Sequence, residues 1–283
     1  MCIIGVYTNE QKDCGFETTK KAVSILKNKG VEFYLDEQVA GQLDPTLAIG
    51  DRDVNYLLVF GGDGTMLSAA RKYAPRGTAI LGFNMGRMGF LLDTEISELE
   101  NAIDGLLTGN FKIEERLMLE VEVTAADGHV REREFALNES VISQRAILRI
   151  INIDVRVNGQ MMDSLDCDGV IVATPTGSTG YNLSAGGSVV TPGLDVMLIT
   201  PVCNHSLSSG RMIISGDDVV TIEPSANSRF YPALTLDGQR YIDINAGDKV
   251  IVKRAGFKAR FIRYTDKNFF MVLKDKFTEW SRK

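Results

Sequence analysis

The spacing of apolar residues changes once along this chain, near residue 112, and that change constrains the fold more than any other feature. Before it, segments typical of buried strands alternate with segments typical of helices. After it, apolar and polar residues alternate with a period of two, as they do in strands that bury one face. The sequence therefore predicts an α/β domain followed by a β-rich domain.

The first third of the chain predicts a mostly parallel, Rossmann-like sheet covered by helices. Short apolar runs predict strands at 2–7, 31–35, 54–60 and 78–84. Helical spacing predicts a helix over 17–30 that stops at Gly30. A second helix is predicted over 99–107, with Ser97 and Glu100 as its capping box. Because strands that alternate with helices form parallel sheets, ligands are expected beyond the carboxyl ends of the strands.

The central part of the chain is expected to be all β. Residues 116–123 and 151–157 show the alternation most clearly, and Asn158-Gly159 predicts a hairpin turn. Further strands are predicted at 169–174, 196–202, 212–215, 219–224, 233–237, 249–254 and 258–264. We therefore expect a layered, β-sandwich-type domain over 113–264.

The C-terminal tail returns to helical spacing. Its apolar residues form one stripe, made of Phe269, Phe270, Leu273, Phe277 and Trp280. Because an apolar stripe needs a surface to cover, we expect this C-terminal helix to return to the first domain. The predicted domains are 1–112 together with about 265–283, which would bind phosphates and ATP, and 113–264.

The composition and the net charge indicate which kinds of protein this chain can be. The 283 residues include 44% hydrophobic and 24% charged residues, which is typical of a globular protein. No apolar run approaches the ~20 residues of a membrane span, and the N-terminus lacks the basic start of a signal peptide. Four scattered cysteines and two histidines predict neither a disulfide framework nor a metal site. The scattered cysteines fit a cytoplasmic protein, and with a net charge of −6 we expect no nucleic-acid and no membrane partner.

A glycine-rich turn joins the third predicted strand to a helix. Residues 61–65 read Gly-Gly-Asp-Gly-Thr, and such a turn presents backbone N–H groups that an anion can meet. Thr65 is placed to cap the helix. Asp63 would lie beside the phosphates, where a carboxylate can accept a proton from an attacking hydroxyl or hold a metal or a sugar hydroxyl. An ordinary Asp-Gly turn accounts for the same residues equally well.

Two further polar segments lie in the β-rich part. Residues 166–187 run from a strand into a loop rich in Thr, Ser and Gly that carries Tyr181, so small polar groups and an aromatic ring can surround a ligand. Asn138 and Glu139 lie within an apolar, strand-like context where polar side chains need partners. For residues 166–187 the alternative is an ordinary surface loop. For Asn138 and Glu139 it is a pair of polar residues with satisfied hydrogen bonds at a strand edge or bulge, and this alternative is favoured when the pair is considered alone.

Together these segments resemble the NAD kinases. The resemblance covers about residues 54–255 and rests on Gly61-Gly62-Asp63-Gly64-Thr65, "GFNMGRMGFL" at 82–91, Asn138-Glu139, "DGVIVATPTGSTGY" at 168–181 and "LDGQ" at 236–239. The GGDGT turn also occurs in diacylglycerol and sphingoid lipid kinases and, more distantly, in phosphofructokinases, whereas the other segments are more specific. Three departures affect loop shape rather than chemistry: Gly180 for alanine, Asn204 for the proline before His205, and Met212 for a proline.

The resemblance implies ATP-dependent phosphorylation of NAD at the 2′-hydroxyl of its adenosine ribose, in a cleft between the two domains. Asp63 would be the general base. The phosphates would meet Gly61, Gly62, Gly64 and Thr65. The NAD site would be formed by Asp63, Gly64, Asn138, Glu139, Asp166, Asp168, Thr176, Thr179, Gly180, Tyr181, Asn182, Leu183, Ser184 and Gln239. The residue type at Asp166 varies within the family.

The resemblance also implies cofactors and partners. Mg²⁺ or another divalent cation would arrive with ATP, without dedicated metal ligands in the protein. Family members are homo-oligomers, so a homotetramer or homodimer is expected, with His205 a candidate for completing a neighbouring site. One rival is a lipid kinase, which would need a basic or amphipathic membrane face that a net charge of −6 does not favour. The other is a non-catalytic dinucleotide sensor, against which the presence of Asp63 argues.

Overall fold

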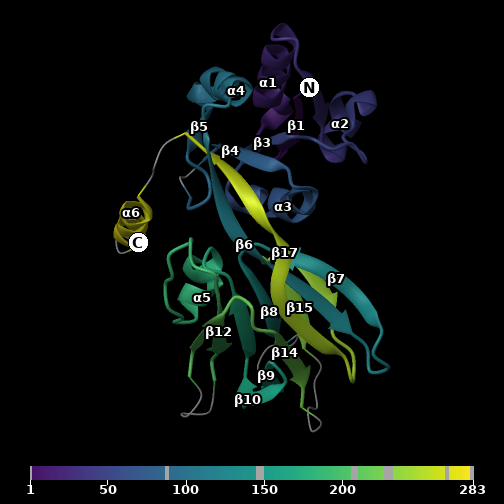
Figure 1. Cartoon of the computed structure of the whole chain (residues 1–283), viewed down its shortest axis with the longest axis vertical. Helices are drawn as coiled ribbons and strands as arrows, with labels where there is room; N and C mark the ends of the chain where they lie inside the picture. The colour runs from purple at the N-terminus through teal and green to yellow at the C-terminus, as the bar shows by residue number, and fades with distance from the viewer. Residues whose placement is uncertain are drawn as a thin grey trace. The chain divides into compact units, whose positions relative to one another are not determined.

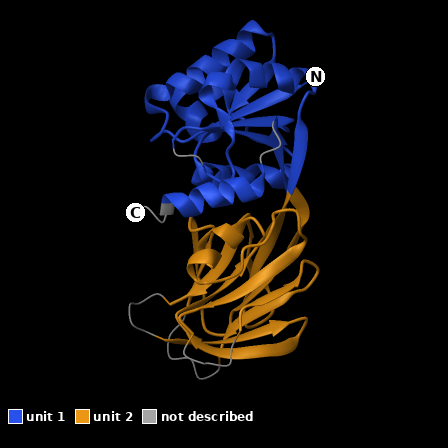
Figure 2. Cartoon of the chain, turned by 90° about the vertical axis from the view of Figure 1, so that its left-hand side faces the viewer, with its two compact units in different colours: residues 1–115, 259–283 blue, residues 116–258 orange. Residues whose placement is uncertain are grey.

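The computed structural model describes residues 2–86, 89–144, 150–204, 210–225, 232–264 and 268–280. The chain forms two compact units, Met1–Glu115 with Ala259–Lys283 (unit 1) and Arg116–Lys258 (unit 2), which Figure 2 colours separately. Two long strands, which Figure 1 labels, are β6 (Lys112–Thr124) and β17 (Lys249–Arg263). Each has residues in both units.

Unit 1 contains a parallel sheet in the order β4-β3-β1-β2. Its strands are β1 (Ile3–Thr8), β2 (Glu32–Leu35), β3 (Tyr56–Gly61) and β4 (Ala79–Asn84), and a short β5 (Thr94–Glu95) pairs with β4. From β1 the chain adds β2 on one side and β3 on the other. The carboxyl ends of β1 and β3 therefore meet at a topological switch point, where open α/β sheets bind their ligands.

The N-terminal helices of unit 1 connect these strands. They are α1 (Glu17–Asn28), α2 (Glu37–Leu43), α3 (Asp63–Tyr73) and α4 (Leu99–Thr108). Buried strand residues such as Val6, Phe60 and Phe83 pack with Leu26 of α1 and Ile103 of α4 in one apolar core. The predicted α/β domain is confirmed.

The start of α4 differs from the prediction. The capping box is formed by Glu95 and Glu98, not by Ser97 and Glu100. A 3-10 turn over Ile96–Glu98 precedes α4, so the first N–H groups that need capping occur earlier in the chain than the apolar spacing indicates.

Unit 2 is a sandwich of two sheets. One sheet has the antiparallel order β13-β12-β11-β8-β15-β16; the other contains β10-β9-β14-β17, with β6 paired to β17 and to β7. The strands are β7 (Val130–Ala136), β8 (Glu139–Ser143), β9 (Ile151–Val157), β10 (Gln160–Cys167), β11 (Gly169–Ala173), β12 (Val196–Val202), β13 (Met212–Ser215), β14 (Val220–Pro224), β15 (Ala233–Leu236) and β16 (Arg240–Asp243). Val172 and Leu234 of the first sheet share one core with Val155 and Val252 of the second, which confirms the predicted β-sandwich-type domain.

The predicted C-terminal helix is α6 (Phe269–Trp280), which belongs to unit 1. The ring of Phe269 lies 6.5 Å from the ring of Phe90, whereas Phe270 and Phe277 of the predicted stripe are 64% and 41% exposed. The Trp280 side chain lies outside the described residues. None of the helices formed by the described residues has the length and apolar character of a membrane span.

Candidate functional site

The glycine turn lies at the switch point of unit 1, directly after β3. Helix α3 begins at Asp63 with Gly62 as its N-cap, so Thr65 caps the helix from position N3 of a capping box and not from the N-cap position. The Thr65 hydroxyl accepts hydrogen bonds from the Gly62 N–H at 3.3 Å and from the Asn9 amide at 3.4 Å. A Cβ on Gly61 would lie less than 3.0 Å from that hydroxyl, so the turn requires glycine there. The first N–H groups of a helix favour an anion, which makes this a candidate phosphate site.

The Asp63 carboxylate is held by the loop that follows β4. Its Oδ2 accepts the Phe90 N–H at 2.9 Å, and its Oδ1 accepts the Leu91 N–H at 3.2 Å. A Cβ on Gly89 would lie less than 3.0 Å from both carboxylate oxygens. Residues 87 and 88 of this loop lie outside the described part of the chain. Two backbone donors thus fix the orientation of the Asp63 carboxylate.

Lys12 is a functional candidate that sequence reasoning missed. Its Nζ lies less than 3.0 Å from the position that a Cβ on Gly62 would occupy, and 3.6 Å from that of a Cβ on Gly86. The Lys12 N–H donates to the Asn9 carbonyl at 3.0 Å, which holds the loop after β1. Within the described ranges Lys12 has no ion pair, so its ammonium group can neutralise an anion at the glycine turn. Its place in the loop after the first strand is the only signal that the sequence offers.

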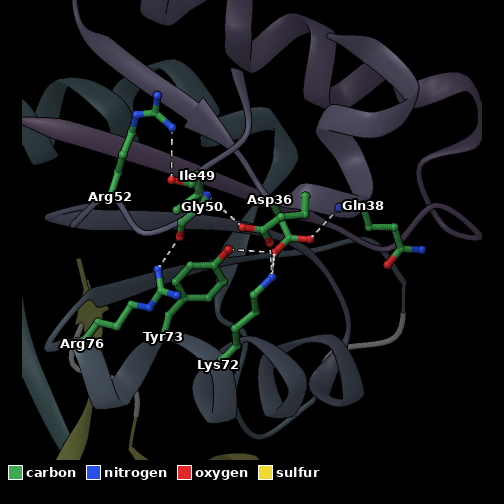
Figure 3. A network of polar contacts seen from close by, with 9 residues as sticks. Asp36, Gln38, Ile49, Gly50, Arg52, Lys72, Tyr73 and Arg76 are labelled. Carbon is green, nitrogen blue, oxygen red and sulfur yellow. Dashed lines mark hydrogen bonds and ion pairs between the residues drawn. The ribbon is translucent and has the colours of Figure 1, made fainter. Parts of the chain in front are cut away.

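A second polar cluster follows β2 at the same edge of the sheet (Figure 3). The buried Asp36 carboxylate accepts hydrogen bonds from the Tyr73 hydroxyl at 2.7 Å and from Lys72 Nζ at 2.5 Å, and Glu37 also pairs with Lys72. Burial, together with the charge of Asp36, raises the pKa of the Tyr73 hydroxyl. Because Lys72 and Tyr73 end α3, this cluster anchors the helix whose N-terminus carries Asp63.

In unit 2, Asp237 organises the backbone around Asn138 and Glu139. Its carboxylate accepts the N–H groups of Leu137, Asn138 and Glu139 at 3.1, 2.7 and 3.2 Å. The Asp237 N–H donates back to the Glu139 carbonyl at 3.0 Å. The sequence predicts a role for Gln239 of the "LDGQ" segment but none for Asp237, whose contacts join segments that lie far apart in the sequence.

Glu139 is buried, yet within the described residues its Oε2 has no hydrogen-bond partner. Burial and the nearby Asp237 carboxylate raise the pKa of Glu139 to about 8. A Cβ on Gly180 would lie 3.1 Å from this Oε2 and 3.5 Å from the side-chain amide nitrogen of Asn138. A buried polar atom without a partner is costly, so this oxygen marks a place where a ligand's donor would be satisfied.

The loop after β11 packs against Asn138. A Cβ on Gly177 would lie less than 3.0 Å from the Asn138 carbonyl, so the two backbones approach closely. The Thr179 hydroxyl donates to the Thr176 carbonyl at 3.3 Å, and Arg116 donates to the Thr176 hydroxyl at 3.3 Å. These contacts bring the predicted residues Thr176, Thr179 and Gly180 to the Asn138-Glu139 pair.

Asn182 holds this loop together from inside. Its amide nitrogen donates to the carbonyls of Ser178 and Ser188 at 3.2 and 3.0 Å, and its amide oxygen accepts the Thr200 hydroxyl at 2.7 Å. Asn182 is completely buried. The loop itself therefore occupies the polar groups of this predicted NAD-site residue.

Tyr181 is 44% exposed at the start of α5 (Tyr181–Ser184), which contains Leu183 and ends with the exposed Ser184. Asp168 and Cys203 lie beside it. A hydrogen bond with the Asp168 carboxylate raises the pKa of the Cys203 thiol, and burial, followed by the charges of Cys203 and Asp168, raises the pKa of Tyr181. An exposed ring next to a carboxylate is suited to stack on a polar, planar ligand.

The remaining predicted residues lie elsewhere. Asp166 is exposed on β10, where the Asn152 amide donates to it, and the Gln239 N–H donates to the Leu236 carbonyl at 2.9 Å in the turn before β16. His205 is outside the described residues. Among the residues that are described, no three His, Cys, Asp or Glu side chains form a metal-binding group. The phosphate residues lie in unit 1, together with Asp63 and Gly64 of the predicted NAD site, and the other dinucleotide residues lie in unit 2. Their joint site stays a prediction.

Both halves of the chain match models of one protein family. Residues 4–111 match the ATP-NAD kinase N-terminal domain, and residues 137–264 match the ATP-NAD kinase C-terminal domain. A protein named NAD kinase from Natranaerobius thermophilus is 37% identical, with 97% of each chain covered. The NAD kinase of Caldanaerobacter subterraneus subsp. tengcongensis is 39% identical, with 98% of this chain and 99% of that one covered.

Two solved structures share the fold of this chain. The crystal structure of an NAD kinase from Archaeoglobus fulgidus in complex with ATP superposes with a TM-score of 0.72 at 25% identity, covering 98% of both chains. The yeast NADH kinase complexed with NADH has the same fold, with a TM-score of 0.86 at 22% identity, covering 97% of this chain and 86% of that one. The chain described here belongs to the ATP-NAD kinase family.

Proposed function

We propose that this protein is an NAD kinase, which transfers the terminal phosphoryl group of Mg-ATP to the 2′-hydroxyl of the adenosine ribose of NAD and releases NADP and ADP. The observation that carries this proposal is the match to relatives named NAD kinase, at 37% and 39% identity over nearly the whole chain. A fold alone would not support an activity, because one fold hosts many functions.

Asp63 is the proposed general base. The ribose oxygen forms a bond to the γ-phosphorus while the bond from that phosphorus to the β,γ-bridging oxygen breaks. The hydroxyl proton passes to the Asp63 carboxylate, and ADP leaves with the bridging oxygen. A ribose hydroxyl is a weak nucleophile at neutral pH, so an oriented proton acceptor is worth about 10²–10⁴-fold in rate. The backbone donors of Phe90 and Leu91 support this assignment because they hold the carboxylate in one orientation.

The phosphates are proposed to meet Gly61, Gly62, Gly64 and Thr65 at the N-terminus of α3, with Lys12 as a neutralising cation. Phosphoryl transfer requires mainly positioning and charge neutralisation from the protein. Mg²⁺ enters as part of the substrate Mg-ATP and is held by the phosphates. The helix N-terminus and the Lys12 ammonium group support the proposal because both favour negative charge.

NAD is proposed to bind to the cluster of unit 2. Glu139 and Asn138 would hold the adenosine part, and Tyr181 would present its exposed ring to the dinucleotide. The remaining proposed NAD residues are Asp63, Gly64, Asp166, Asp168, Thr176, Thr179, Gly180, Asn182, Leu183, Ser184 and Gln239. The partnerless Glu139 oxygen is the strongest support, since a ribose or adenine donor would satisfy it.

The proposal also includes the oligomeric state of the protein and its location in the cell. We infer a homotetramer or homodimer from the family resemblance, to be measured by light scattering during size-exclusion chromatography. We place the protein in the cytoplasm, which agrees with four cysteines that are all free.

The direct test incubates the purified full chain with Mg-ATP and NAD and measures NADP with an NADP-specific dehydrogenase. NADP should accumulate with ATP present and not without it. A non-catalytic sensor would bind NAD in calorimetry without forming NADP. A lipid kinase would instead phosphorylate diacylglycerol in mixed vesicles. Folded protein that yields no NADP under any of these conditions would overturn the proposed activity.

A further inference from the structure

The loop that holds Asp63 is itself held from its other side. The Leu91 N–H donates to Asp63 Oδ1 at 3.2 Å, and the Leu91 carbonyl accepts a hydrogen bond from Arg263 Nη1 at 3.0 Å. A single loop residue is thus bonded both to the proposed base and to the last residue of β17. The side chain of Arg263 is only 11% exposed, so this hydrogen bond is largely protected from water.

Two carboxylates fix the direction of the Arg263 guanidinium. Its Nε donates to Glu114 at 2.7 Å, and its Nη1 also reaches Asp93 at 3.3 Å. Since a guanidinium is planar and rigid, contacts on two of its edges determine where the remaining N–H groups point. The Arg263 N–H that donates to the Leu91 carbonyl is therefore held in a fixed direction.

The second residue that donates to Asp63 is held by the same end of the chain. Phe90 gives its N–H to Asp63 Oδ2, and its ring lies 6.5 Å from the ring of Phe269 in α6. Both backbone donors of the Asp63 carboxylate are therefore supported by residues after position 259, although Asp63 lies early in the sequence.

We propose that Arg263 is a positioning residue for phosphoryl transfer, which orients the Asp63 carboxylate through Leu91 without touching the substrate. The inference rests on the proposed function only in taking Asp63 as the group that meets the ribose hydroxyl. Proton acceptance depends on hydrogen-bond geometry, and a displacement of about 1 Å can cost on the order of 10²-fold in rate. Losing Arg263 frees the Leu91 carbonyl and allows the loop, and Asp63 with it, to move.

The same strand provides a matched control. Arg260 Nη1 donates to the Gly77 carbonyl at 3.2 Å, in the turn beyond the C-terminal end of α3. Arg260→Met and Arg263→Met each remove one arginine of β17 and one hydrogen bond to a loop carbonyl, and Arg263→Met also removes the contacts with Glu114 and Asp93. Only Arg263 is linked through that carbonyl residue to Asp63.

The test measures kcat and KM for NAD and ATP in both variants of the full chain, with melting temperatures to establish folding. Arg263→Met should lower kcat by about 10- to 100-fold with both KM values within about threefold of wild type. Arg260→Met should keep kcat within about threefold. If the two variants have equal kcat values, Arg263 has no positioning role.

A double-mutant cycle separates positioning from general structural damage. Once Asp63→Asn has removed the base, adding Arg263→Met should lower the residual kcat no further, because both changes act on the same group. A merely structural arginine would lower kcat by the same factor in both backgrounds, which would overturn the proposal.

A conservative variant keeps the proposal testable if Arg263→Met does not fold. Arg263→Lys retains a cation between Glu114 and Asp93, but its single ammonium group lacks the fork that also holds Leu91. It should fold and still lose kcat by about fivefold or more with KM unchanged. Full wild-type kcat in this variant would refute the inference. Absence of NADP formation by the wild-type chain would instead refute the proposed function.

Discussion

The carboxylate of Asp63 occupies the space that a side chain at Gly89 would need. A Cβ there would lie less than 3.0 Å from both carboxylate oxygens, a separation that real Cβ atoms essentially never show. The carboxylate of Asp63, on a helix far from this loop in the sequence, therefore requires a glycine at position 89. A substitution of Gly89 can therefore test the role of Asp63 without changing Asp63 itself.

Gly89→Ala should push the Asp63 carboxylate away from the Phe90 and Leu91 N–H groups and lower kcat by on the order of 10²-fold. Gly86→Ala in the same loop is the control, since the nearest atom to its Cβ would be Lys12 Nζ, at 3.6 Å. Steady-state kinetics and melting curves of both variants check this. Equal activity in the two variants would show that the Asp63 geometry is unimportant.

Asp63→Asn keeps the size of the side chain and removes its charge and basicity. We expect kcat to fall by about 10²–10⁴-fold, with NAD affinity changed only modestly, because the loss is confined to the transition state. Kinetics and NAD calorimetry on a variant with a normal melting curve measure both effects. A kcat within a few-fold of wild type would leave the glycine turn as a phosphate cradle and remove Asp63 as the base.

Much of the fold could be predicted because its elements are encoded locally, in the period of the apolar residues. The elements that were missed lack that signal. Strand β7 (Val130–Ala136) carries charges on both of its faces, and Arg133 finds its ion-pair partner, Glu122, on the neighbouring strand β6. Helix α2 (Glu37–Leu43) is too short for an apolar stripe to identify it.

The residues of the candidate site could be predicted from motifs, but their arrangement could not. Asp237 holds Glu139 across 98 positions of sequence, and Arg263 holds Leu91 across 172. Local spacing contains no information about which distant segments meet. The same limit applies to Lys12, which belongs to none of the motifs. Its position beside Gly62 depends on the folded loop after β1 and could not be predicted from the sequence.

Lys12→Met tests the proposed cation at the glycine turn. Removing a charge-assisted contact of about 1.5–3 kcal/mol should raise KM for ATP by roughly 10- to 100-fold and leave KM for NAD within about threefold. Lys20→Met is the control, because Lys20 Nζ donates to the Gly15 carbonyl at 2.8 Å in the turn before α1. If ATP kinetics are equal in both variants, Lys12 does not meet the phosphates.

Tyr73→Phe tests the cluster that anchors α3 (Figure 3). The buried hydroxyl donates to the Asp36 carboxylate at 2.7 Å, so its removal should lower the free energy of unfolding by about 1.5–3 kcal/mol. Tyr34→Phe removes a 2.9 Å hydrogen bond to Glu32 at an exposed site and should cost less than about 0.5 kcal/mol. Denaturant unfolding of both variants measures the difference, and equal losses would show that burial of the Asp36 cluster is irrelevant to stability.

Glu139 gives a prediction about pH because its environment favours the neutral acid. Its pKa is raised from 4.5 to about 8, chiefly by burial and then by the charge of Asp237. Between these two values the folded chain keeps the Glu139 proton, whereas the unfolded chain has released it. The folded state therefore binds more protons, and the contribution of Glu139 to stability falls as the pH rises through this window.

Glu139→Gln removes this titration while keeping a neutral side chain of similar size. The free energy of unfolding of the variant, relative to wild type, should therefore rise between about pH 5 and pH 8, by up to about 1.4 kcal/mol per pH unit, and level off above pH 8. Glu115→Gln is the control, since Glu115 is exposed on β6. Urea unfolding of the three proteins at several pH values provides the measurement. If the difference between Glu139→Gln and wild type stays constant with pH, Glu139 does not keep its proton in the folded protein.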